Sequence, residues 1–171
     1  GLAVLTLNRP EAMNALSREL RAALLCAPDD ENCDHRLALL LTMLEVDEER
    51  RDAVCALADV AERHGKRLLP VAETVLAWRT DPDRETRTAL LRFAGYAGCV
   101  DQTHWLVDHL VVEGSESGAA RQGLAALGAE ITDVLLKEAA HGRRSKRDAI
   151  LPLLRELRVD HDDLWDLYER E

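Results

Sequence analysis

The sequence predicts an all-α protein, an α-solenoid of about four helical hairpins stacked in series behind one short N-terminal strand or extended segment. Two observations predict it: a composition typical of packed helices, and a short signature that recurs along the chain. Apolar residues make up 47 % of the 171 residues and charged residues 32 %, whereas aromatic residues make up only 4 %. Strands would need more aromatic and β-branched residues, so this mixture favours amphipathic helices around one continuous core.

The signature is an arginine followed two residues later by a small residue, and three and six residues later by large apolar residues. It recurs at intervals of 36, 34 and 26 residues, which indicates repeated supersecondary units. Residues three and four apart share a helix face, so the small and apolar positions form one stripe with the arginine at its edge. The stretches are 51–57, 87–93, 121–127 and 147–153, beginning with Arg51, Arg87, Arg121 and Arg147.

Four hairpins follow from the apolar periodicity and from the Gly, Pro and Asp residues that interrupt it. Gly65 and Gly128 are natural helix ends. In the Asp81-Pro82-Asp83 turn, the proline begins a helix well and a neighbouring aspartate can cap its free amides. The expected helix pairs are 35–45 with 47–64, 66–79 with 84–97, 102–113 with 116–127, and 129–140 with 144–157.

The turn inside each hairpin carries a recurring position six residues before the signature arginine, occupied by Glu45, Asp81, Ser115 and His141. An acid here is expected to accept a hydrogen bond from the arginine of its own or the next unit. This hairpin, with its Asp-Pro turn, its arginine and its Ala/Leu-rich second helix, resembles the HEAT-repeat family over about residues 35–157. The resemblance implies a stack of hairpins with a curved surface.

The fourth unit departs from the pattern at Pro152, which lies inside the expected second helix and removes one of its hydrogen bonds. We expect a kink there, and a second division, with 145–158 and 161–170 as the last pair, is also open. In the first division, 161–170 is a final helix whose acids face water and cap the array. Residues 35–171 thus form the repeat domain, and 1–34 a separate strand, turn, helix and linker.

The first residues carry a second resemblance. The stretch Leu-Asn-Arg-Pro-Glu-Ala-Met-Asn-Ala-Leu at 7–16 resembles the segment that follows the first strand of the crotonase (enoyl-CoA hydratase/isomerase) family. The resemblance covers about residues 1–24 and implies that Ala12, Met13 and Ala15 lie near an acyl-CoA cofactor. No Gly-rich turn that could hold the thioester oxyanion is found later, so the catalytic residues of that family are not carried over. An acyl-CoA-binding or crotonase-derived fragment or fusion remains the alternative function.

The net charge limits the classes of partner that the chain is expected to bind. The formal charge of −10, from 22 basic and 32 acidic residues, repels phosphate backbones. We therefore expect no nucleic acid, and a protein partner with a basic or mixed surface. The densest basic cluster, 143–147, is interpreted as a solvated helix end. The sequence contains neither an apolar run of about 18 residues nor a secretory leader, which predicts a cytoplasmic protein without membrane contact. The unpaired N-terminal strand could join two copies in a homo-oligomer.

The best candidate for a metal site is the group of His104, Asp108 and His109, of which the first two share a helix face. Two ligands on one helix face make at most half of a metal site. We therefore interpret the three residues as a surface ion pair beside a half-buried histidine. Cys55 and Cys99 are expected to be small core residues rather than reactive thiolates. No catalytic residue, metal or cofactor is expected.

The sequence therefore favours a non-catalytic scaffold that binds a protein partner over an enzyme. In a solenoid the second helices of the hairpins line the inner face, so exposed charged residues on those helices are the candidate contacts. These candidates are Asp52, Asp59, Glu62, Arg84 and Arg92.

Overall fold

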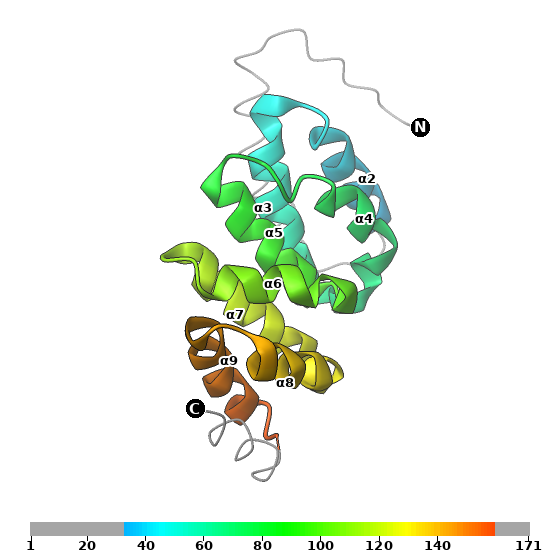
Figure 1. The fold of residues 1–171 in the computed structure, drawn as a ribbon. Helices are drawn as coiled ribbons and strands as arrows, with labels where there is room; N and C mark the ends of the chain where they lie inside the picture. The colour runs from blue at the N-terminus through cyan, green and yellow to red at the C-terminus, as the bar shows by residue number, and fades with distance from the viewer. Residues whose placement is uncertain (1–32, 160–171) are drawn as a thin grey trace, which may run out of the picture.

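A computed structural model describes residues 33–159, and the regular structure of these residues is entirely helical. The helices follow one another in pairs along an elongated body, with the earliest at one end and the latest at the other (Figure 1). The all-α prediction is confirmed for these residues. The strand and helix expected within 1–34 and the helix expected at 161–170 fall on residues that the structure does not describe, apart from 33 and 34.

The second helices of the four expected hairpins match their predicted bounds to within one residue. The first three second helices pack extensively against each other, whereas the fourth packs mainly against its own first helix. Each is amphipathic, because its apolar residues recur every three to four positions and form one buried stripe. The helices are α3 (Asp47–His64), α5 (Arg84–Tyr96), α7 (Ser115–Leu127) and α9 (Arg144–Glu156).

The first helices of the pairs are less regular than predicted. They are α2 (Cys33–Met43), α4 (Ala72–Leu76), α6 (Thr103–Leu110) and α8 (Thr132–His141). The single helix expected over 66–79 is wrong in its first half, where Gly65–Val71 forms a 3₁₀ helix, η2, that contains Pro70. Proline lacks an amide hydrogen and its ring crowds the preceding turn, so a regular α-helix is disfavoured there. Short 3₁₀ segments, η3 (Val100–Gln102) and η4 (Gly128–Ile131), likewise lead into α6 and α8.

Glycine and aspartate set the helix ends as expected. Gly65 and Gly128 end α3 and α7 with φ of +57° and +66°, a conformation that residues with a Cβ rarely adopt. Asp83 caps α5, and its Oδ2 accepts hydrogen bonds from the amide and the hydroxyl of Thr86, both at 2.8 Å. These bonds favour the carboxylate and hold the pKa of Asp83 below its ordinary value.

Pro152 does not end the last helix. α9 continues past it to Glu156 and packs against α8, as the pair expected at 129–140 and 144–157 requires. The proline ring is exposed and removes only one backbone bond, whereas Ile150, Leu153 and Leu154 are buried and hold the helix on its neighbours. The second helix of the alternative division, 161–170, lies outside the described residues.

The small residue of the signature marks a close approach between helices. In α7 it is Gly123, and a Cβ built on the facing Gly95 of α5 would lie 2.1 Å from the Cα of Gly123. Such a distance excludes any side chain at Gly95 unless the backbones move apart. In the first two units the corresponding residues are Ala53 and Ala89, which are buried.

Candidate protein-binding surface

A half-buried arginine joins the first two hairpins. The guanidinium of Arg50 in α3 lies 3.5 Å from the centre of the Trp78 ring. Its Nε donates to the carbonyl of Leu44 at 2.9 Å, and its Nη1 lies 3.8 Å from Oδ2 of Asp81 in the next turn. Only 13 % of the Arg50 side chain is exposed. Stacking on a tryptophan and pairing with an acid make this arginine a connection between two units.

Arg50, rather than Arg51 of the predicted signature, is the structural counterpart of Arg87. Arg50 and Arg87 are each the fourth residue of their helix, and each donates to the carbonyl six residues earlier. Arg51 is 57 % exposed and lies 3.4 Å from Glu85 on the surface. The sequence pattern fits only Arg51, because Val54 and Leu57 lie three and six residues after it, so the apolar spacing alone points to the exposed arginine.

A buried carboxylate lies at the second junction, where the second hairpin meets the third. Glu116 of α7, whose side chain is 5 % exposed, accepts a hydrogen bond from Nη2 of Arg87 at 2.8 Å. Nε2 of His109 lies 3.7 Å from the same carboxylate, and Nε of Arg84 lies 4.0 Å from it. A buried carboxylate needs such partners, because burial of an unpaired charge is costly.

The hydrogen bond expected between the turn acid and the arginine of its own or the next unit is wrong at Asp81. Arg87 donates instead to the backbone carbonyls of Asp81 and Pro82, at 2.8 and 2.7 Å. The carboxylate of Asp81 accepts from the amide of Asp83 at 2.8 Å and otherwise faces Arg50 of the preceding hairpin. The turn is therefore held through its backbone, and the acid connects backward along the chain.

A lysine lies at the third junction, where the third hairpin meets the fourth. Nζ of Lys146 in α9 lies 2.8 Å from Asp108 of α6 and donates to Glu138 of α8 at 2.9 Å. Hydrogen bonds to Asp108 and then to Glu138 raise the pKa of Lys146. The same bond from Lys146, followed by one from His104, lowers the pKa of Glu138. Each junction thus has a cation near the start of a second helix.

The candidate metal ligands do not converge. His104 pairs with Glu138 at 2.9 Å and Asp108 with Lys146, so both reach toward the fourth hairpin rather than toward each other. Nδ1 of His109 lies 2.9 Å from the Trp105 carbonyl. Among residues 33–159, no three His, Cys, Asp or Glu side chains are placed to hold a metal ion.

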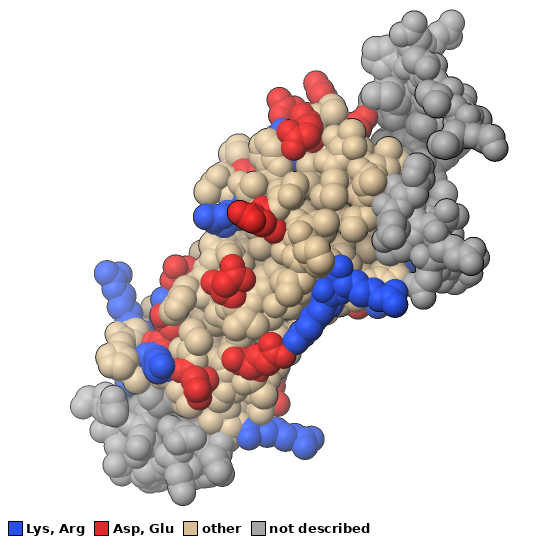
Figure 2. All heavy atoms as spheres, turned by 90° about the vertical axis from the view of Figure 1, so that its right-hand side faces the viewer, with Lys and Arg blue, Asp and Glu red and all other residues tan. Residues whose placement is uncertain are grey.

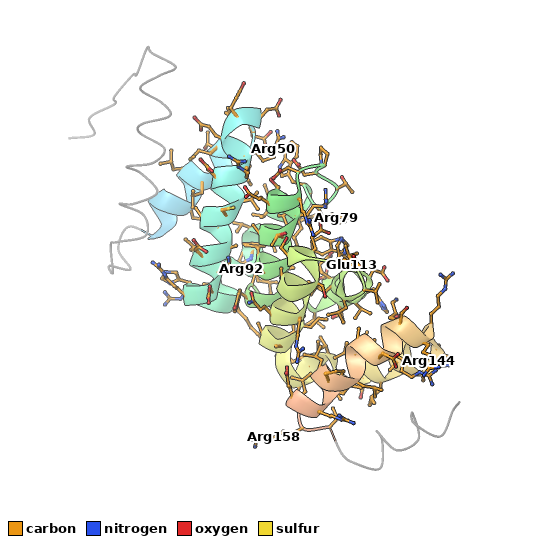
Figure 3. The ribbon with its side chains drawn as sticks, turned by 90° about the vertical axis from the view of Figure 1, so that its left-hand side faces the viewer. Arg50, Arg79, Arg92, Glu113, Arg144 and Arg158 are labelled. Carbon is orange, nitrogen blue, oxygen red and sulfur yellow. The ribbon has the colours of Figure 1, made fainter. Side chains whose placement is uncertain are left out.

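Three of the five predicted contact residues meet on one surface. Nη2 of Arg92 in α5 donates to Glu62 of α3 at 2.8 Å and lies 3.3 Å from Asp59. The hydroxyl of Tyr96, one turn after Arg92, lies 3.5 Å from Glu62. We call Asp59, Glu62, Arg92 and Tyr96 the Arg92 cluster. Figure 3 shows Arg92 on the side formed by α3 and α5.

The Arg92 cluster is accessible. The exposed fractions of its charged side chains are 29 % for Asp59, 49 % for Glu62 and 30 % for Arg92. Sequence reasoning missed Tyr96, although its spacing of four from Arg92 places both on one face of a helix. An Arg and a Tyr side by side on a partly exposed helix face were the available signal, because these residue types dominate binding hot spots.

The other two predicted residues are placed differently. Asp52 lies 4.0 Å from Arg51 on α3, near the start of that helix. Arg84 begins α5 and donates to the carbonyl of Glu113 at 2.7 Å, which directs it toward the α6–α7 turn. Neither is joined to the Arg92 cluster by these contacts. The residues of the crotonase-like alternative, Ala12, Met13 and Ala15, lie outside the described part of the chain.

The two thiols in the repeats have different surroundings. Cys99 is buried, and burial followed by the nearby Asp101 carboxylate raises its pKa to about 11. Such a thiol is almost fully protonated at neutral pH and is a poor nucleophile, as expected of a core residue. Cys55 is half-buried and packs against the core.

The face seen from the right of Figure 1 carries acidic and basic side chains scattered over uncharged surface (Figure 2). Within the described residues, no helix combines the length and apolar character required to cross a membrane. Comparisons with protein-family models, with curated proteins and with solved structures find no significant match to this chain.

Proposed function

We propose that the chain is an α-solenoid of HEAT-like hairpins that acts as a non-catalytic scaffold and binds a protein partner of basic or mixed charge. The observation that carries the proposal is the Arg92 cluster. Two neighbouring second helices there place complementary charges and a tyrosine on one accessible surface. The cluster includes three of the residues that the repeat pattern predicts to face a partner.

The energetics of the Arg92 cluster suit binding more than folding. Half-exposed ion pairs contribute at most about 1 kcal/mol to stability, so a partner can replace them without unfolding α3 or α5. Arg92 and Tyr96 flank Phe93, which is fully buried and fixes this part of α5 in the core. A surface held rigid by its own core loses little conformational entropy on binding.

The chemistry of the partner follows from charge. The cluster carries two carboxylates and one guanidinium, and the whole chain carries a net charge of −10. A partner that offers a basic side chain to Asp59 and Glu62, with an acid near Arg92, would exchange these ion pairs at the interface. The net charge would also accelerate the approach of a basic partner at low ionic strength.

A capture experiment tests this proposal. The immobilised wild-type protein is incubated with native lysate beside two charge-reversal variants, Glu62→Arg in the Arg92 cluster and Glu73→Arg on the exposed side of α4. Quantitative mass spectrometry then compares the captured proteins. The proposal predicts a protein that wild type and Glu73→Arg retain and that Glu62→Arg loses by about tenfold. It fails if both variants retain every captured protein equally, or if none is captured and a small substrate is turned over.

A further inference from the structure

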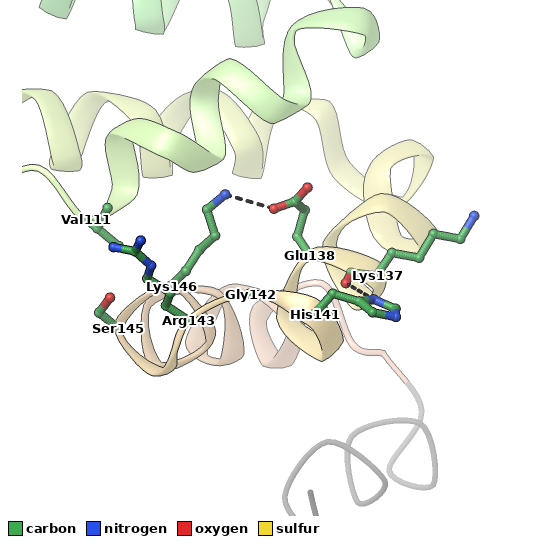
Figure 4. Close-up of a pocket in the computed structure, with 8 residues that line it drawn as sticks. All are labelled: Val111, Lys137, Glu138, His141, Gly142, Arg143, Ser145 and Lys146. Atoms are coloured by element: carbon green, nitrogen blue, oxygen red, sulfur yellow. Dashed lines mark hydrogen bonds and ion pairs between the residues drawn. The ribbon is translucent and has the colours of Figure 1, made fainter. Parts of the chain in front are cut away.

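A pocket of about 600 Å³ lies where the fourth hairpin meets α6. Figure 4 shows its walls: the end of α6, the last turn of α8, and the first turn of α9. It is separate from the Arg92 cluster, whose residues come from α3 and α5. The pocket is lined by Val111, Lys137, Glu138, His141, Gly142, Arg143, Ser145 and Lys146.

Three of the residues that line the pocket are cations, and one of them, Lys146, is paired with both Glu138 and Asp108. The one acid of the pocket, Glu138, is already paired with Lys146 and His104. Lys137 and Arg143 are exposed, and no carboxylate of the described residues lies within ion-pair distance of either. Further along α9, Arg144 lies 3.9 Å from Asp148 in an exposed pair.

Two of the three cations of the pocket also lie at the N-terminus of α9, a helix end that favours negative charge. α9 begins without a side-chain cap, and its first turn contains no acid. Helix N-termini favour negative charge by roughly 0.3–1 kcal/mol per group, so cations such as Arg143 and Arg144 are unfavourable there on their own. An acidic ligand would complement both the side chains and the helix end.

An apolar edge adjoins these cations. Val111, which lines the pocket, is 45 % exposed, and the adjacent Val112 is 40 % exposed. They follow directly on α6, which ends at Leu110. Large apolar side chains this exposed, next to a charged pocket, can receive an apolar side chain from a ligand.

From this arrangement we propose that the pocket binds an acidic peptide segment carrying an aliphatic or aromatic side chain. The carboxylates contact Arg143 and Lys137, and the apolar side chain packs on Val111. A peptide fits better than a nucleic acid, because a long polyanion is repelled by the chain's net charge of −10. A short segment experiences mainly the local field, since screening limits the range to about 8 Å at physiological salt.

Fluorescence anisotropy of a labelled peptide tests the proposal on the full chain. The probe is a short peptide in which aspartates and glutamates flank a central Leu-Trp pair, and a second probe replaces every acid by its amide. Binding of the acidic probe is expected to weaken about tenfold in Arg143→Glu and about threefold in Val111→Ser. The amide probe is expected to bind at least about tenfold more weakly to the wild type.

Arg51→Glu is the matched control, because it makes the same charge change on an exposed side chain of the first hairpin. Its affinity for the acidic probe should stay within about twofold of wild type. No variant should melt more than about 2 °C below the wild type, which excludes unfolding as the cause. The proposal is overturned if the probe does not bind at millimolar concentration, or if Arg143→Glu binds as well as Arg51→Glu. Equal binding of the amide probe, or tighter binding of a labelled DNA oligonucleotide, also overturns it.

Discussion

Gly95 of α5 and Gly123 of α7 face each other so closely that neither can carry a side chain. A Cβ on Gly95 would lie 2.1 Å from the Cα of Gly123, and a Cβ on Gly123 would lie 2.6 Å from the carbonyl oxygen of Leu91. Both contacts are to backbone, which cannot move aside as the end of a flexible side chain can. This crossing fixes the second and third hairpins against each other.

Gly95→Ala should therefore lower the free energy of unfolding by about 3 kcal/mol, because overpacking outweighs the smaller gain from replacing a helical glycine. Gly118→Ala, also in α7, is the matched control, since a Cβ there meets nothing within 4 Å. It should raise the free energy of unfolding by about 0.5–1 kcal/mol. Urea denaturation followed by circular dichroism measures both. Similar effects of the two substitutions would contradict the close crossing.

Two signature arginines should differ in their contribution to stability. Arg87→Met removes the main partner of the buried Glu116 carboxylate and should cost about 2–3 kcal/mol. Arg121→Met removes a pair with Glu156 in which both side chains are about half exposed, and should cost less than about 1 kcal/mol. Chemical denaturation measures the loss of unfolding free energy in each variant. Equal losses would mean that burial of Glu116 is not what makes Arg87 important.

The assignment of Arg50 as the junction arginine can be tested by two conservative changes. Arg50→Lys cannot keep both the planar stacking on Trp78 and the bond to the Leu44 carbonyl, and should cost about 1–2 kcal/mol. Arg51→Lys, one residue later and largely exposed, should change stability by less than about 0.5 kcal/mol. Trp78 fluorescence should respond to Arg50→Lys alone. The reverse order of effects would restore Arg51 as the signature residue.

The cap of α5 should make stability depend on pH. The folded pKa of Asp83 lies below its ordinary value of 3.8, so its contribution is complete above that value and lost as pH falls through the lower folded pKa. Asp83→Ala should be about 1 kcal/mol less stable than wild type near neutral pH. The difference should shrink as pH falls below 3.8. Asp83→Asn keeps an acceptor that does not titrate, so an unchanged difference between Asn and wild type across this range would refute the argument.

Cys99 should be inert in the folded protein. With a pKa of about 11 it is only about one part in a thousand thiolate near pH 8, and its side chain is buried. Alkylation by iodoacetamide, followed by mass spectrometry, should label Cys99 only in denaturant. Labelling of the native protein at the rate found for the unfolded chain would show that this part of the core opens readily.

The sequence predicted the second helices well because their ends depend on local chemistry. Gly65, Gly128 and the capping Asp83 act within a few residues of their own position, so they can be identified without knowing the fold. The 3₁₀ helix at Gly65–Val71 was missed, although Pro70, which disfavours a regular α-helix, is visible in the sequence.

The register of the repeat was harder to predict. Arg87 is the fourth residue of α5, whereas Arg121 is the seventh of α7, so the third signature lies nearly one turn later. A shift of one turn leaves an apolar stripe on the same face, and a sequence pattern cannot detect it. The pairing of Arg92 with Glu62 joins residues of two different hairpins and required the packed structure.

Site-specific photo-crosslinking at Tyr96 tests the central claim most directly. A benzoylphenylalanine replaces Tyr96 in one variant and the exposed Glu73 of α4 in another, and each is illuminated in the native lysate. The proposed scaffold predicts a discrete crosslinked protein from position 96 that is absent from position 73 and disappears when Glu62→Arg is added. Identical crosslinks from both positions, or a crosslink that persists with Glu62→Arg, would contradict a partner bound at the Arg92 cluster.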